Sequence, residues 1–169
     1  MKVVQQSITK QSVRDALLDV MDPEIPTLSI VDLGIVHRVD ITDAGIQVEL
    51  MPTFVGCPAL DAIKESVQER LAELAPGVPV SVKFTMDEPW TTDRISEKGR
   101  EALKSSGFAP PPTGKMPARG NLIQLLPVAE CPYCGSRKTL MENAFGPTLC
   151  RAIYYCRDCR QPFEQFKQV

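Results

Sequence analysis

Apolar residues recur first at helical spacing and then at strand spacing along the opening half of the chain, with turn residues between the runs. Asp22-Pro23 marks the end of the first helical run because the residue before a proline disfavours helical geometry. The pattern predicts, in order, a helix over residues 9–21, a loop over 24–30, strands over 35–41 and 46–51, a helix from Pro58 to about residue 74, and a strand over 78–84. This α-β-β-α-β order predicts an α+β domain, a small mixed sheet covered on one face by two helices.

The pattern changes after residue 88. A short helix is predicted from Asp93 to Ser105, capped by Thr92 and stopped near Gly107. The stretch over residues 109–120 is rich in proline and glycine, so it predicts a linker. The expected organisation is therefore a domain over residues 1–88, a connector over 89–127 and a small module over 128–169.

Two Cys-x-x-Cys knuckles lie in the C-terminal module. They are Cys131-Pro-Tyr-Cys134 and Cys156-Arg-Asp-Cys159, with twenty-one residues between the second and third cysteines. Paired knuckles at this spacing predict one tetrahedral zinc site of the zinc-ribbon type. Four thiolates leave no open coordination position, so the zinc is expected to be structural. The alternatives are two redox dithiols or two unrelated turns.

Short strands are predicted over residues 139–142 and 152–155, with a turn over 145–147. A module of this size buries little apolar surface, and a bound metal offsets that deficit. Cys150 lies six residues before Cys156. The sequence favours Cys150 as a core thiol of the ribbon, but a fifth sulfur beside the metal is the other interpretation.

Composition and charge narrow the function classes. No apolar run of about 18 residues exists and the N-terminus lacks the apolar stretch of a signal peptide, so the protein is expected to be cytoplasmic, not bound to a membrane, with reduced cysteines. Residues 1–88 hold 7 basic and 14 acidic side chains, whereas residues 89–169 hold 12 and 7. An acidic body with a mildly basic tail argues against nucleic-acid binding.

Cys57 and three acidic residues are the candidate functional positions of the first domain. Cys57 lies at the predicted start of a helix, where free N–H groups favour a thiolate. Such a sulfur can bind metal, attack a disulfide or hold an iron–sulfur centre, and packing of the helix start is an equally good interpretation. Asp22, Glu24 and Asp32 lie in the loops before it, where capping of turns is the simpler role for the two aspartates. No catalytic residue is assigned.

These motifs together resemble a known family. The stretches Asp22-Pro-Glu-Ile-Pro, Ile30-Val-Asp-Leu-Gly-Ile35 and Pro52-Thr-Phe-Val-Gly-Cys57-Pro58 are similar to the small iron–sulfur assembly domain of SufT-type proteins. With Trp90-Thr-Thr-Asp-Arg-Ile-Ser-Glu-Lys-Gly-Arg100 and the ribbon added, nearly the whole chain resembles the family of D subunits encoded with phenylacetyl-CoA 1,2-epoxidase, a multicomponent monooxygenase.

The resemblance implies a role in aerobic phenylacetate catabolism. It implies an accessory protein that assists assembly of an iron–sulfur or iron centre rather than turning over substrate, with zinc in the ribbon and a transient iron–sulfur cluster. The implied partners are the epoxidase subunits, either the di-iron subunit or the iron–sulfur reductase. Cys57 matches the cysteine of the assembly domain, while Asp22, Glu24 and Asp32 match its acidic motif only loosely.

Three questions stay open from the sequence. Members of the family often carry a further cysteine after Phe-x-x-Phe-Lys, whereas here Phe163-Glu-Gln-Phe-Lys167 is followed by Gln168-Val169. This departure weakens any cluster site built on a C-terminal cysteine. The alternative function is a structural, non-catalytic subunit of the oxygenase, and a thiol redox enzyme is a third functional class. The chain could also form a homo-oligomer.

Overall fold

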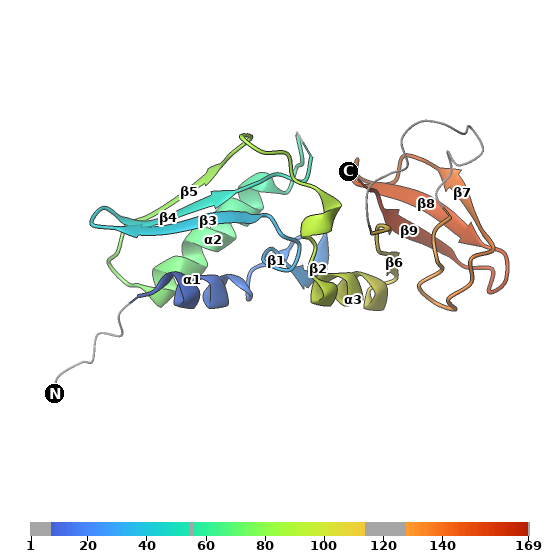
Figure 1. Ribbon diagram of the computed structural model, residues 1–169, viewed down its shortest axis with the longest axis horizontal. Coiled ribbons are helices and arrows are strands. Elements are labelled where there is room, and N and C mark those ends of the chain that lie inside the picture. Colours follow the sequence, from blue (N-terminus) through green and yellow to red (C-terminus); the bar gives the residue numbers. More distant parts are fainter. Residues whose placement is uncertain (1–7, 55, 114–127, 169) are drawn as a thin grey trace. The chain divides into compact units, whose positions relative to one another are not determined.

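The computed structural model describes residues 8–54, 56–113 and 128–168 (Figure 1). The chain forms two compact units, which we call the assembly unit and the ribbon unit. The assembly unit comprises residues 1–52 and 58–89, and the ribbon unit comprises residues 53–57 and 90–169. In the described part of the chain, no helix is long and apolar enough to cross a membrane.

The assembly unit is built on a three-stranded mixed sheet of order β3-β4-β5. Strand β3 (Val36–Thr42) pairs antiparallel with β4 (Gly45–Leu50), and β4 pairs parallel with β5 (Val80–Phe84). Gly45 closes the β3–β4 hairpin at φ +120°, and a Cβ there would lie 2.1 Å from the Pro79 carbonyl oxygen. Only glycine fits this close approach of two backbones.

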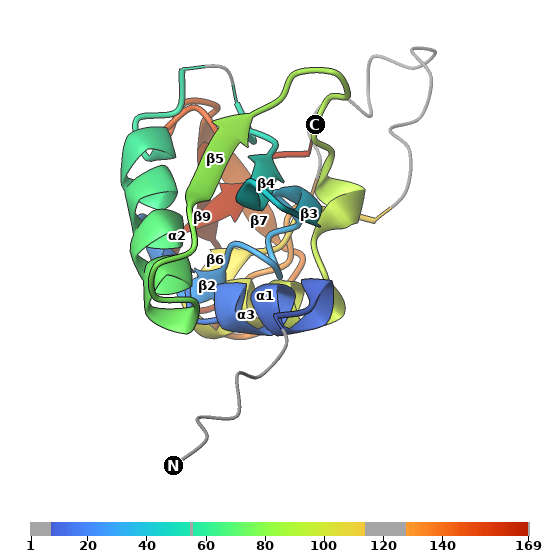
Figure 2. The ribbon, with the colours of Figure 1, turned by 90° about the vertical axis from the view of Figure 1, so that its left-hand side faces the viewer.

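Helices α1 (Lys10–Leu17) and α2 (Leu60–Leu74) cover one face of that sheet (Figures 1 and 2). Thr9 caps α1 through a reciprocal pair of hydrogen bonds with Ser12. Alternate β4 residues point into the same interior because strand side chains alternate between faces. The interior is aliphatic, with Val13, Leu17, Ile46, Val48, Leu50, Ile63, Val67 and Leu71 all buried. The predicted α+β fold with a mixed sheet is confirmed.

The segment between α1 and β3 differs from the prediction. Helix α1 ends at Leu17, and residues expected to be helix or loop form the antiparallel pair β1 (Met21–Asp22) and β2 (Ile25–Ser29). The Ile30 N–H donates to the Val20 carbonyl at 2.9 Å and extends this pairing. The hairpin pairs backbone N–H and C=O groups that a loop would leave to water. The helical periodicity of the preceding residues could not predict this hairpin.

The ribbon unit is built on a four-stranded sheet of order β6-β9-β8-β7. Strands β7 (Thr139–Asn143), β8 (Arg151–Cys156) and β9 (Pro162–Phe166) form an antiparallel meander, and β6 (Phe108–Ala109) pairs parallel with β9. The sequence predicted the strands now seen as β7 and β8 but missed β9 and β6. The paired residues Tyr154 and Phe163 stack their rings 5.6 Å apart in the interior of this sheet.

The segment before β6 packs within the same unit. A 3₁₀ turn (Thr92–Arg94) leads into α3 (Glu97–Ser105), so the predicted helix starts four residues later than expected and Ser96 caps it in place of Thr92. Arg100 fastens this segment by donating to the carbonyls of Pro111 and Thr92. Residues 114–120 of the predicted linker lie outside the described part of the chain.

Candidate metal centre

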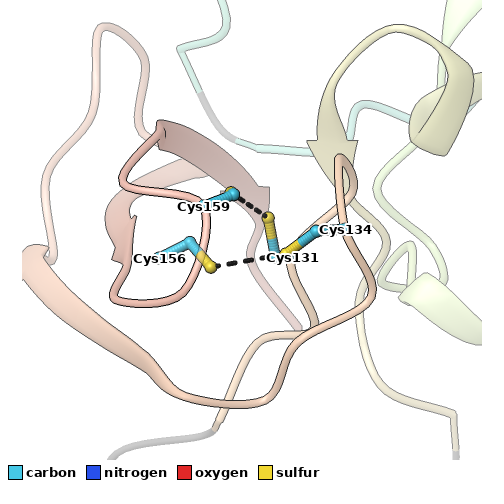
Figure 3. Close-up of side chains that lie close together, drawn as sticks. All are labelled: Cys131, Cys134, Cys156 and Cys159. Atoms are coloured by element: carbon cyan, nitrogen blue, oxygen red, sulfur yellow. Dashed lines mark hydrogen bonds between the residues drawn. The ribbon is translucent and has the colours of Figure 1, made fainter.

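The four knuckle cysteines converge on one point of the ribbon unit (Figure 3). The sulfurs of Cys131, Cys134, Cys156 and Cys159 all lie within 4.8 Å of one another. Cys131 and Cys159 are 3.6 Å apart at sulfur, as are Cys134 and Cys156. None of them forms a disulfide.

This spacing fits a tetrahedral metal. Four sulfurs at about 2.3 Å from a central ion stand about 3.8 Å from one another, close to the two distances observed here. Thiolates are soft ligands, and a four-sulfur tetrahedron is typical of Zn²⁺ or of iron in a sulfur site. The donor set therefore fits a metal held by four cysteines, with Cys131 and Cys156 buried and Cys134 at the surface.

The two knuckles are the same turn built twice. In the first, the Gly135 N–H donates to the Cys131 carbonyl at 2.9 Å, and in the second the Arg160 N–H donates to the Cys156 carbonyl at 2.9 Å. Gly135 and Arg160 follow the last cysteine of each knuckle and have φ values of 73° and 59°. The repeated geometry brings both cysteines of each knuckle to one side, so two such turns can surround one ion.

Side chains also join the knuckles directly. Ser136, just after the first knuckle, donates to Asp158 in the second at 2.7 Å, and Lys138 bonds the other oxygen of that carboxylate at 3.3 Å. The hydrogen bond from Ser136, with help from Lys138, holds the pKa of Asp158 below its usual value. These bonds join residues about twenty positions apart, so the knuckle spacing in the sequence did not predict them.

Backbone donors prepare the cluster for a cation. The Cys159 N–H is the largest influence that lowers the pKa of Cys156, to about 7. Burial, helped by the neighbouring thiols and opposed by the Gln161 N–H, raises the pKa of Cys159 to about 12. The cluster therefore favours its first negative charge at Cys156, while a full set of thiolates requires the charge of a metal.

Cys150 lies at the opposite end of β8 from the metal centre. Six residues of extended chain span roughly 20 Å, so its sulfur cannot join Cys156 at one ion. Cys150 is buried, and its sulfur lies 3.0 Å from the Thr148 hydroxyl. The interpretation of Cys150 as a fifth sulfur beside the metal is therefore wrong, because the strand carries it away from the knuckles.

Cys57 is half-buried in the loop that precedes α2. Helix α2 starts at Leu60 with Ala59 as its cap, so Cys57 stands before the first turn rather than in it, and Pro58 is not the first helical residue. Ala59 offers no side-chain hydrogen bond to the helix start. The first N–H groups of α2 therefore lack a side-chain cap, an arrangement that favours an anion near this end.

The acidic residues of the assembly unit serve its turns. One carboxylate oxygen of Asp22 accepts from the backbone N–H groups of Glu24 at 2.8 Å and Ile25 at 3.0 Å. Asp32 accepts from the hydroxyl of Ser29 at 2.9 Å, and that hydroxyl accepts the Asp32 N–H. These bonds shape the β1–β2 hairpin and the following turn, which supports the capping role of both aspartates.

Two family models match separate parts of the chain. The model of the iron-sulfur cluster assembly protein family matches residues 10–84, and the model of the PaaD zinc beta ribbon domain matches residues 118–167. The Escherichia coli (strain K12) protein named as the D subunit of 1,2-phenylacetyl-CoA epoxidase is 37% identical over 153 residues, covering 90% of this chain and 89% of that protein. The chain belongs to the family of phenylacetyl-CoA epoxidase D subunits.

The Escherichia coli protein thus matches nearly the whole chain, whereas other relatives match just over half of it. The Fe-S protein maturation auxiliary factor YitW of Bacillus subtilis (strain 168) is 34% identical over 95 residues, which cover 56% of this chain and 92% of that protein. A solved domain of unknown function from Bacillus anthracis, DUF59, is 28% identical with a TM-score of 0.51 and covers 55% of this chain and 89% of that one. The D-subunit family therefore joins a fold that also occurs alone to a cysteine ribbon.

Proposed function

We propose that this chain is an accessory protein of a phenylacetyl-CoA epoxidase that assists assembly of an iron–sulfur or iron centre in that enzyme. One observation carries the proposal. A single chain that aligns along 89% of an epoxidase D subunit contains, over residues 10–84, the domain of the iron-sulfur cluster assembly family. The similarity of 95 residues of the chain to an Fe-S protein maturation auxiliary factor supports an assembly role.

In this proposal the two cysteine sites have different tasks. Cys131, Cys134, Cys156 and Cys159 hold one structural zinc, because they form a complete four-sulfur set with no position left for a substrate. Cys57 is the contact for iron or a cluster in transit to the epoxidase, because its half-buried sulfur precedes a helix start without a side-chain cap. Asp22 and Asp32 shape turns of the assembly unit through their carboxylates, and Glu24 lies in the first of these turns.

Anaerobic reconstitution tests this division of labour. Wild type, Cys57→Ser and Cys150→Ser would be incubated with iron and sulfide, desalted and assayed for metal content, absorption spectrum and activation of purified epoxidase. We expect iron binding and activation in wild type and Cys150→Ser, and the loss of both in Cys57→Ser. Cys150 is a matched control because it is a second thiol outside the metal centre. Full activation by Cys57→Ser would contradict the proposal.

A structural subunit of the oxygenase is the second candidate, favoured by the name "subunit" that the Escherichia coli relative carries. A structural subunit remains in stoichiometric complex with the epoxidase, whereas an assembly factor dissociates after delivery. Size-exclusion chromatography of the co-expressed proteins distinguishes the two. Co-elution at a fixed ratio, unaffected by Cys57→Ser, supports the structural role.

A further inference from the structure

A groove of about 330 Å³ lies in the ribbon unit beside the first knuckle. We call it the knuckle groove, and the residues that line it include Gly107, Phe108, Tyr133, Ile153, Pro162 and Glu164. Its volume is at the lower end of the range of ligand sites in proteins. It is formed by the end of α3, strand β6, the knuckle and the central strands, all within one compact unit.

Tyr133 ties this groove to the metal centre. It stands between the ligand pair Cys131 and Cys134, and its side chain is 57% exposed. Its ring packs directly on the backbone of Gly107, where a Cβ would lie only 2.9 Å from the Tyr133 hydroxyl oxygen. Tyr133 forms one wall of the groove, and its position depends on the knuckle turn that carries Cys131 and Cys134.

The chemistry of the groove favours an aromatic group beside a cation. Phe108 and Tyr133 supply ring surfaces, which attract aromatic side chains and cations alike. Among the described residues that line the groove, Glu164 alone is charged, and the negative end of the α3 dipole lies next to it, at Gly107. Tyr and Trp anchors in such pockets dominate many protein interfaces.

The neighbouring cation faces inward. Arg151 lies over the Phe108 ring, 4.9 Å from its centroid, and bonds Glu164 at 3.1 Å. Only 9% of the Arg151 side chain is exposed, against 28% for Glu164. Of this bonded pair the carboxylate is the more exposed group, and this face already stabilises one cation against an aromatic ring.

We propose that the knuckle groove is a docking site for a polypeptide segment that presents an aromatic side chain next to a basic one, and that the site forms only when the four cysteines hold a metal. The inference rests on the metal-binding part of the proposed function and is independent of Cys57. Metal loading would then decide whether the protein can engage its partner.

The test is an NMR titration of the full chain, loaded with zinc, with the peptide N-acetyl-Lys-Phe-Lys-amide. We expect the amide signals of Gly107, Tyr133 and Ile153 to shift together, and binding to be about tenfold weaker when the peptide carries Ala for Phe or Glu for Lys. Protein stripped of zinc should show no saturable shift at these amides. Cys57→Ser should bind the peptide like wild type.

Single substitutions distinguish binding in the knuckle groove from non-specific binding to the protein surface. Tyr133→Ala should weaken peptide binding about tenfold while keeping one zinc per chain, and Tyr133→Phe should retain binding. Phe145→Ala is the matched control, because Phe145 is another exposed aromatic of the ribbon unit, 70% accessible, that does not line the groove. Equal binding by Tyr133→Ala, by stripped protein or by the Glu-flanked peptide would overturn the inference, as would an absence of shifts at the groove.

Discussion

The buried side chains of the assembly unit differ in size and chemical type from those around the knuckles of the ribbon unit. The assembly unit packs large aliphatic side chains of α1 and α2, such as Leu17 and Leu71, against Val48 and Leu50 of its sheet. The ribbon unit buries Trp90, Leu103 and Phe166 away from the knuckles. Its cluster at the knuckles consists of small side chains and two aromatics: Ala109, Ala129, Cys131, Ala152, Tyr154, Cys156 and Phe163. Two of the seven are cysteines of the metal centre. Folding of the first unit can rest on apolar burial, whereas the region around the knuckles needs a further source of stability.

Removal of the metal should produce the largest difference in folding between the two units. Structural zinc contributes about 10 kcal/mol or more to small cysteine modules, so chelation should unfold the ribbon unit and spare the assembly unit. The measurement is an amide NMR spectrum before and after treatment with a strong chelator. Signals from β8 and β9 should collapse towards unfolded positions while those from β3 and β4 stay. Retention of the ribbon signals in metal-free protein would mean that its core suffices alone.

Substitution of a single ligand should have nearly the same effect. Cys156→Ser replaces a buried thiolate with a poor zinc ligand, so zinc content should fall well below one per chain and the ribbon should become sensitive to protease. Cys150→Ser removes the other thiol of the same strand region and should keep its zinc. Loss of metal in both variants, as measured by atomic emission, would point to misfolding instead of ligand loss.

A core truncation in the assembly unit should show the opposite pattern. Leu71 is fully buried on α2, so Leu71→Ala should lower the free energy of unfolding of this unit by about 2–5 kcal/mol. Zinc content should remain at one per chain. Denaturant unfolding followed by far-UV circular dichroism, with parallel metal analysis, checks both results. A loss of zinc in Leu71→Ala would show that the two units do not hold their structures independently.

The knuckle turns offer the finest comparison. Arg160 occupies at φ 59° the position that Gly135 occupies at φ 73°, and non-glycine residues there cost about 1 kcal/mol. Arg160→Gly should therefore stabilise the ribbon slightly, and Gly135→Ala should destabilise it by about the same amount. A Cβ added at Gly135 would meet no described atom within 4 Å, so the cost comes from the backbone conformation and not from a clash. Thermal unfolding of the zinc-loaded protein measures both. A Gly135→Ala protein as stable as wild type would contradict the claim that a non-glycine residue at this position strains the backbone.

The sequence predicted most reliably the features that depend on local pattern. The apolar spacing of α2 and the alternation along β4 follow directly from burial on one face, and the knuckle spacing follows from the reach of two cysteines to one ion. The turn that Asp22 caps is local, but the β1–β2 hairpin was missed because it depends on pairing across that turn, such as the bond from the Ile30 N–H to the Val20 carbonyl. Strand β6 was missed because two residues beside prolines pair only in the presence of β9.

The candidate site shows the same limit. Spacing predicted that the four knuckle cysteines would converge, but it could not show that Cys150 lies at the far end of β8, because that depends on a strand running the whole way between the two positions. Likewise, the bond from Ser136 to Asp158 and the packing of Tyr133 on Gly107 join residues distant in sequence. Such contacts follow from the fold rather than from any local motif.

The central claim is that zinc stays in the ribbon while iron passes through Cys57. Metal analysis of anaerobically reconstituted wild type beside Cys57→Ser tests it most directly. The account predicts one zinc per chain in both proteins and iron in wild type alone. Equal iron in Cys57→Ser, or iron that disappears only when Cys131 or Cys156 is replaced, would contradict the account and assign the iron chemistry to the four knuckle cysteines.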